Sequence, residues 1–375
     1  MTGRRVLIFA LTAGFLIGCL DPYPAPKTGD SKGYLVVDGV VNVSESSARV
    51  RLSRTIGLDS EEGNPPVVSA QVTILGSLGA VISLTHSGSG IYETQYPFRM
   101  DEQYKLTIRT GDKNYESEEV AMVANTAIDS LVYQADKTSL QVRTYAHKDG
   151  ADPGFYRFNY EETYEYRAAF ASLYRFNNGY PLYREPSDDI TSCWLSSSSA
   201  SIMLTSTEGL ADNVIPGFLV REIQRGDPLL WFKYSILVRQ FALDKKTWDY
   251  WNNVQTVSQS LGGLFDPIPF SVQGNIRCTS DPTDRVLGYF SGGQVSTSRI
   301  VIANTNLPTG YYSTRLGNCI EEYVELRDLP TLVGRNIEIT RAEYMGIFLL
   351  GYYFTLPSCA DCRFQGGDNV RPPFM

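Results

Sequence analysis

Residues 48–54 read Ala-Arg-Val-Arg-Leu-Ser-Arg, so that apolar and polar side chains alternate. Residues 70–75, Ala-Gln-Val-Thr-Ile-Leu, show the same alternation, and residues 34–41 are rich in β-branched side chains. A period of two is typical of β-strands that bury one face and expose the other. These three segments predict a β-sheet structure in the first part of the chain.

About seven strand-like segments precede residue 124, at intervals of roughly 8–12 residues, which is a spacing typical of β-sandwiches. The glycine- and serine-rich residues 86–90 between two of these segments favour a hairpin turn. We expect residues 33–125 to form an immunoglobulin-like or prealbumin-like β-sandwich. Residues 126–375 contain further strand-like segments, and we expect them to form a larger β-rich second domain. The predicted fold class is therefore mainly β.

One helix is expected at about residues 244–261, packed within the second domain. Asp244 is a good N-cap, and apolar side chains recur behind it every three or four residues. Two glycines at 262–263 favour the end of the helix. Its two tryptophans, Trp248 and Trp251, suit either an aromatic shelf for a ligand or core packing on a sheet, and we favour core packing.

The composition is that of an acidic, folded protein. Its 375 residues include 33 Lys and Arg against 41 Asp and Glu, which gives a formal net charge of −8. An acidic surface repels phosphate backbones, so nucleic-acid binding is disfavoured. Apolar residues make up 43% of the chain and charged residues 20%, which argues against a disordered protein.

Residues 1–18 have the pattern of a secretory signal, because a basic pair at 4–5 precedes a twelve-residue apolar segment. The segment ends in Leu-Ile-Gly-Cys, which resembles the bacterial lipobox. The resemblance implies a lipoprotein signal peptide that is cleaved before Cys19, and lipidation of the Cys19 thiol. Residues 19–32 are rich in proline and predict an extended tether. The alternative is an ordinary signal peptide followed by an incidental cysteine.

The remaining cysteines are Cys193, Cys278, Cys319, Cys359 and Cys362. Exported proteins usually oxidise their thiols, so we predict two structural disulfides and one thiol left over. We favour a bond from Cys319 to Cys359 or Cys362. Two alternatives stay open: a zinc site made by the last four of these cysteines, which has only one of the usual paired spacings, and a redox role for the Cys-x-x-Cys pair at 359–362.

The sequence offers little that is typical of an active site. A Ser-His-Asp triad would need His86 or His147, and neither lies in a hydrolase motif. Adjacent acids such as those at 188–189 would face opposite sides of a strand, which makes poor acid/base pairs. The segment 281–284, Asp-Pro-Thr-Asp, predicts a turn, with calcium binding as a weaker alternative. We predict no catalytic residues, no metal site and no cofactor.

The tyrosine-rich stretch 155–183 allows two interpretations. Tyrosine gives large, rigid contact area for binding a peptide or a glycan. It is equally common in ordinary strands, which we favour. The ligand class stays open.

Several features occur together in this chain: the lipobox, the opening strand 34–40, Cys193-Trp194, the Trp-bearing helix, Pro269 with Gly274-Asn275-Ile276, residues 286–290 and the tail 359–363. In combination they resemble a family of outer-membrane lipoproteins of Bacteroidota-type bacteria, catalogued as domain of unknown function 4249. The resemblance implies an all-β sandwich followed by a larger β-rich domain. It also implies a place in the outer membrane beside a TonB-dependent receptor, and it implies no known activity.

We therefore predict a lipid-anchored, surface-exposed lipoprotein of the cell outer membrane, a non-enzymatic binding accessory of a TonB-dependent nutrient-uptake system. Its partners would be the membrane, through acylated Cys19, and a TonB-dependent receptor. The first alternative is a structural or adhesive envelope lipoprotein. The second is a surface hydrolase whose site is assembled from distant strands.

Overall fold

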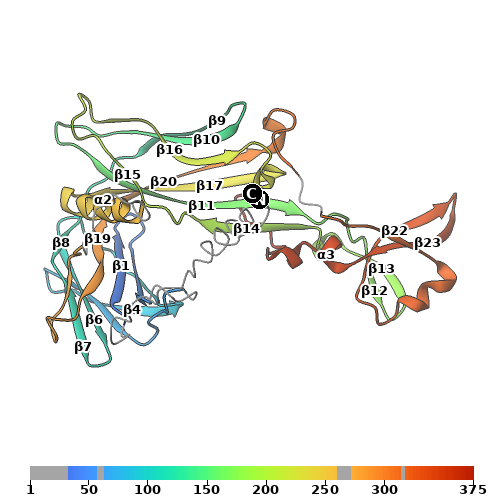
Figure 1. The fold of residues 1–375 in the computed structure, drawn as a ribbon, viewed down its shortest axis with the longest axis horizontal. Helices are drawn as coiled ribbons and strands as arrows, with labels where there is room; N and C mark the ends of the chain where they lie inside the picture. The colour runs from blue at the N-terminus through green and yellow to red at the C-terminus, as the bar shows by residue number, and fades with distance from the viewer. Residues whose placement is uncertain (1–32, 57–62, 260–271, 314–316) are drawn as a thin grey trace, which may run out of the picture.

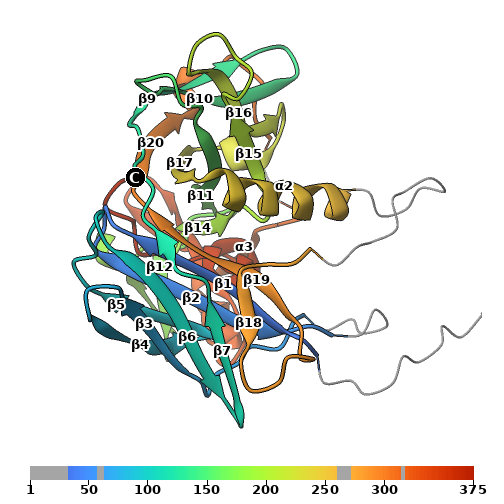
Figure 2. The ribbon, with the colours of Figure 1, turned by 90° about the vertical axis from the view of Figure 1, so that its left-hand side faces the viewer.

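The computed structural model describes residues 33–56, 63–259, 272–313 and 317–375. These residues are mainly β and form several sheets with a few helices, which confirms the predicted fold class (Figures 1 and 2). The predicted signal at 1–18 and tether at 19–32 lie outside the described residues. None of the helices within these four ranges is long and apolar enough to cross a bilayer.

A ten-stranded sheet folds around one core to make the first sandwich, in the order β18-β7-β6-β3-β4-β5-β2-β1-β19, with β8 paired to β6. Its strands are β1 (Leu35–Asn42), β2 (Ser47–Arg54), β3 (Gln71–Gly76), β4 (Val81–Gly88), β5 (Ile91–Gln95), β6 (Gln103–Thr110), β7 (Lys113–Ser117), β8 (Val120–Ala121), β18 (Ile276–Cys278) and β19 (Val286–Gly293). The alternating side chains predicted from residues 48–54 do point into this core, because Ala48, Val50 and Leu52 are buried and their neighbours are not.

Two strands of the first sandwich come from beyond residue 125. β19 pairs in parallel with β1, from Leu35 opposite Val286 to Asn42 opposite Gly293, and β18 pairs with β7. The boundary expected between residues 125 and 126 assigns both strands to the second domain, whereas they complete the sheet of the first. Alternation along a strand reports which face is buried, but it does not report the partner strand.

The second sandwich packs a three-stranded sheet, β16-β10-β9, on a five-stranded one, β14-β11-β17-β20 with β15 beside β11 (Figure 1). Its strands are β9 (Ile128–Ala135), β10 (Ser139–His147), β11 (Phe155–Arg167), β14 (Ser192–Ser198), β15 (Met203–Ser206), β16 (Val214–Gln224), β17 (Lys233–Leu243) and β20 (Val295–Ala303). Side chains from both layers, such as Val142 on β10 and Ile236 on β17, are fully buried in one core.

A fourth sheet, of five strands, has the order β13-β12-β22-β23-β21 and lies at one end of the long axis (Figure 1). Its strands are β12 (Tyr174–Asn177), β13 (Tyr180–Tyr183), β21 (Glu322–Glu325), β22 (Glu338–Met345) and β23 (Phe348–Thr355). We call this sheet and its loops, residues 172–184 and 317–356, the C-terminal arm.

The short helices of the chain are α3 (Pro357–Ala360) and the 3₁₀ turns Pro186–Asp188, Pro228–Leu230, Asn304–Asn306, Leu326–Leu332 and Cys362–Gln365.

The predicted helix is present as α2 (Lys245–Gln259) and lies between the two sandwiches (Figure 2). The Asp244 carboxylate accepts a hydrogen bond from the Thr247 backbone N–H at 2.7 Å, which confirms the N-cap. Trp248 packs against Phe155 with ring centroids 5.7 Å apart, so this tryptophan is a packing residue. Residues 260–261 and the two glycines at 262–263 fall outside the described residues.

The chain crosses between the two sandwiches three times: at 123–126, between α2 and β18, and at 293–296. The first and third crossings lie side by side, because Val123 bridges to Gly293. Two hydrogen bonds also hold the first crossing against the buried Gln240. The Gln240 side chain donates to Asn125 Oδ1 at 3.1 Å, and Asn125 Nδ2 donates to the Gln240 backbone carbonyl at 2.7 Å. The two sandwiches are therefore interlocked.

Candidate functional site

Two disulfides fix the C-terminal arm to the second sandwich. Cys319 is bonded to Cys359, and Cys193 on β14 is bonded to Cys362. The first bond is one of the two that we favoured. Both bonds converge on the segment 359–362, which joins β23 of the arm to the body. We call this junction the neck.

The disulfides overturn the zinc and redox alternatives. Cys359 and Cys362 are bonded to different partners, so the Cys-x-x-Cys pair holds no free dithiol. The leftover thiol, Cys278, is buried in the first sandwich. Among the described residues, no three His, Cys, Asp or Glu side chains are grouped in a way that would hold a metal ion.

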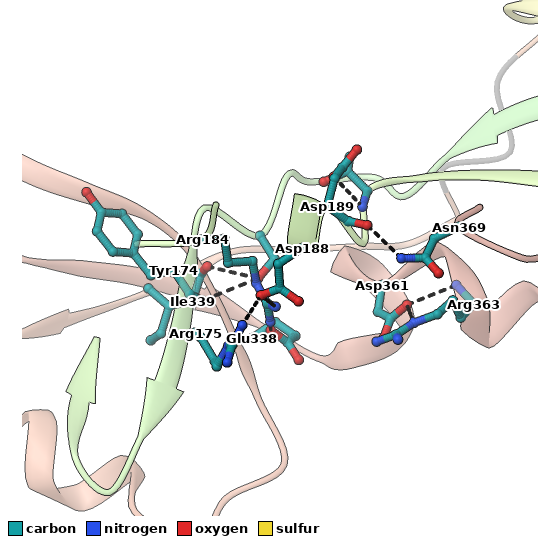
Figure 3. Close-up of polar contacts among 12 residues, drawn as sticks. Tyr174, Arg175, Arg184, Asp188, Asp189, Glu338, Ile339, Asp361, Arg363 and Asn369 are labelled. Carbon is teal, nitrogen blue, oxygen red and sulfur yellow. Dashed lines mark hydrogen bonds and ion pairs between the residues drawn. The ribbon is translucent and has the colours of Figure 1, made fainter. Parts of the chain in front are cut away.

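Ion pairs reinforce the neck (Figure 3). The nearly buried Arg184 guanidinium donates to Asp188 Oδ2 at 2.9 Å and to Glu338 Oε2 at 2.8 Å. Asp188 also pairs with Arg175, and Ser172 Oγ donates to Glu338 Oε2 at 2.9 Å. Arg184 thus connects the end of β13 both to the loop before β14 and to the first residue of β22.

Arginine side chains lower the pKa values of two acids in and beside the neck. The hydrogen bond from Arg175 holds the pKa of Asp188 below its usual value. Burial raises the pKa of Asp361, but hydrogen bonds from Arg363 outweigh it and leave that pKa lowered. Arg363 Nη2 lies 2.6 Å from Asp361 Oδ2 (Figure 3). Charges that are paired in this way suit a rigid structural connection better than a reactive centre.

The arm carries a concentration of exposed apolar side chains. Of the 26 large apolar side chains exposed among the described residues, 14 lie on the arm. Its own core is small, with six buried apolar residues. Exposed large apolar side chains that are gathered in one region of a fold are candidates for an interaction surface. The arm is therefore the candidate functional site, and the neck holds it in place.

Other predicted positions have structural partners. His147 Nδ1 lies 2.8 Å from Asp129 Oδ2 at an exposed position. The segment 281–284 forms the predicted turn, and the Lys113 ammonium supplies the positive charge at its two carboxylates, at 3.4 and 2.8 Å. The acids at 188–189 have separate partners, since Asp188 binds two arginines whereas Asp189 accepts from the Thr191 backbone. Cys19 lies outside the described residues.

The tyrosine-rich stretch divides into two parts. On β11, Tyr156, Tyr164 and Tyr166 are buried in the second core, as expected of ordinary strands. On β13, Tyr180 and Tyr183 are exposed on the arm. Sequence reasoning gave no sign of Arg184 or Glu338, because residues 154 positions apart carry no local signal of an ion pair.

A hollow of about 250 Å³ lies between α2 and residues 272–275. Tyr250 and Tyr289 line it with ring centroids 4.7 Å apart, and Lys246 and Asp249 lie at its rim. Burial raises the pKa of Tyr250 to about 12, so this phenol stays neutral at ordinary pH. The hollow has no convergent pair of groups for acid/base chemistry, and we assign it no ligand.

A family model described as a domain of unknown function, DUF4249, matches residues 21–299. The match includes the first sandwich and α2 and ends within β20, before the last three strands of the arm. No curated protein matches the chain.

Proposed function

The chain belongs to the DUF4249 family, and we propose that it is a non-enzymatic accessory lipoprotein of the outer membrane that works by binding a partner. In this proposal acylated Cys19 attaches it to the membrane, residues 19–32 act as the tether, and a TonB-dependent receptor is the partner. The resemblance of the leader to a lipobox supports the anchor, and the family resemblance supports the receptor.

The observation that carries the binding function is the C-terminal arm. Two disulfides and the Arg184 cluster fix the arm to the body, while its β13 edge presents Tyr180, Leu182 and Tyr183 to solvent. A rigid element loses little conformational entropy when it binds. Exposed tyrosines on such an element are side chains typical of binding hot spots.

Photo-crosslinking tests the proposal directly. The arm contains no lysine, so amine-reactive reagents would not label it. A photoreactive amino acid placed at Tyr180, which is 74% exposed, should capture a TonB-dependent receptor in native outer membranes. The matched control is the same probe at Leu78, which is 70% exposed on the first sandwich and should capture no receptor.

A second measurement uses affinity purification in mild detergent. The full-length protein should retain a near-stoichiometric receptor, and the double variant Tyr180→Ser/Tyr183→Ser should lose most of it. Recovery of the lipoprotein alone, with no crosslink from Tyr180, would refute the receptor partner and favour the adhesive alternative. Hydrolytic activity of the pure protein would refute the non-enzymatic function.

A further inference from the structure

We propose that the tip of the β22–β23 hairpin, residues 344–348, inserts into the interfacial region of a lipid bilayer and is a second membrane contact. The tip reads Tyr-Met-Gly-Ile-Phe and contains no charge. Tyr344 is 55% exposed, Met345 65%, Ile347 89% and Phe348 67%. Ile347 is the most exposed large apolar side chain among the described residues.

The tip is the closed end of a paired hairpin. Tyr344 pairs with Leu349 and Met345 with Phe348 up to a two-residue turn, and a register shift at Leu350 separates this paired end from the rest of the two strands. Gly346, with a φ of 63°, supplies the left-handed conformation of that turn. The cross-strand pairs satisfy the inward-facing backbone groups, and those on the outer edges of the hairpin can stay hydrated in the interfacial region, where an unpaired group in the hydrocarbon itself would be costly.

Behind the tip lies a collar of aromatic and charged groups. The Arg341 guanidinium lies 3.5 Å from the centroid of the Tyr353 ring, and Tyr353 packs against the exposed Tyr323 with centroids 5.3 Å apart. Arg341 is also paired with Glu321 and Glu343. Tyrosine and arginine are the side chains that favour the headgroup level of a bilayer. An apolar end followed by such a collar matches the layering of a membrane interface.

The shape and composition of the tip favour a lipid surface over a protein as the occupant. The side chains of residues 344–348 offer only the Tyr344 hydroxyl for a directed hydrogen bond, so the tip itself carries little that would orient a specific protein partner. The tip also lies at the end of the long axis, where a protruding hairpin can enter a surface without a matching pocket (Figure 1). In the proposed function the chain is attached to a bilayer through Cys19, so a lipid surface is available to the tip, and this step rests on that proposed function.

The test uses the full chain with Cys19→Ser, which removes acylation, and vesicles of phosphatidylcholine. We expect the protein to float with the vesicles and to stay bound at 1 M salt, since the contact is apolar. Adding Ile347→Ser and Phe348→Ser should weaken binding by about 100-fold, because each of the two buried apolar side chains contributes at least about 10-fold. The control adds Leu78→Ser and Val81→Ser, which are as exposed on the first sandwich, and should bind unchanged.

A second measurement locates the contact. In the Cys19→Ser chain, Phe348→Trp should be quenched by brominated lipid, and Leu78→Trp should not. No vesicle binding by Cys19→Ser, or equal binding by the tip variant, would overturn the inference. So would a dimer that the tip substitutions dissociate without lipid, because a second copy would then cover the tip. The crosslink from Tyr180 to a receptor is measured in a separate experiment. The receptor partner and the membrane contact of the tip can therefore be refuted independently of each other.

Discussion

The side-chain amide of Asn275 pairs with both backbone polar groups of Phe290. Asn275 Nδ2 donates to the Phe290 carbonyl at 2.7 Å, and Asn275 Oδ1 accepts from the Phe290 N–H at 2.9 Å. Because Phe290 lies on β19, the last strand of its sheet, Asn275 takes the place of a neighbouring strand. These hydrogen bonds join residues 274–276 to the strand around Phe290. Both segments are among the sequence features on which the family resemblance rests.

Replacing Asn275 should therefore destabilise the first sandwich. Asn275→Ala leaves a buried N–H and a buried carbonyl unpaired, and we expect it to lower the free energy of unfolding by about 2–4 kcal/mol. Asn275→Asp keeps the shape but removes the donor, and it should be destabilising as well. Urea unfolding measures both, with the exposed Asn336→Ala as the control. A loss no larger than that of the control would contradict the role of the amide.

Gly288 should tolerate no side chain. It has a φ of 114°, and an added Cβ would lie 1.8 Å from the Val37 carbonyl oxygen on β1. Gly79 has a similar φ of 98° but open space around it. Gly79→Ala should thus cost only the backbone strain, about 1 kcal/mol, whereas Gly288→Ala should cost several times more, because β1 and β19 must separate. Thermal unfolding compares the two, and equal losses would show that the close approach to Val37 is unimportant.

The bond between Cys193 and Cys362 should contribute strongly to the stability of the neck. It closes a loop of 169 residues, so replacing both cysteines by serine should cost about 2–5 kcal/mol. Hydrogen exchange should speed up first in β22 and β23. The buried free thiol gives the control, because Cys278→Ser should leave exchange in the arm unchanged. Unaltered protection of the arm in the double variant would show that the ion pairs suffice.

Arg184→Met should loosen the arm as well. The side chain of Arg184 is 10% exposed, and its loss leaves Glu338 and Asp188 without their shared cation. Because Glu338 is 20% exposed and Asp188 is 33% exposed and keeps Arg175, the cost should be smaller than the ~3–5 kcal/mol typical of a fully buried pair. Arg327→Met is the matched control, since Arg327 is 77% exposed and its ion pairs lie at the surface. Similar unfolding curves for the two variants would contradict the role of the cluster.

His147 should report a pH-dependent contact. The hydrogen bond and charge of Asp129 raise the pKa of His147 above its ordinary value of about 6.5. The protonated pair therefore stabilises the fold below about pH 6.5, and this contribution is lost as the pH rises through the raised pKa. NMR titration of the imidazole should show the raised pKa, and Asp129→Asn should return it toward 6.5.

Local sequence patterns predicted the elements better than their partners. Alternation located β2 and β3, and the Asp244 cap located the start of α2, because these signals lie within a few residues. The pairing of β1 with β19 depends on which strand fills the edge of the sheet, and no local pattern encodes it. The arm was missed for a related reason. Its strands come from two distant segments, 174–183 and 322–355, and only the folded chain brings Arg184 to Glu338.

The parallel pairing of β1 with β19 also constrains the order of folding. Leu35 is synthesised about 250 residues before its partner Val286, so one edge of β1 stays uncovered until then. Contacts between such distant residues slow folding, and unpaired strand edges promote aggregation. The first sandwich consequently cannot complete its sheet until residue 293 has been made. The interval before that point, rather than the thermal stability of the finished fold, should be when the chain is most exposed to aggregation.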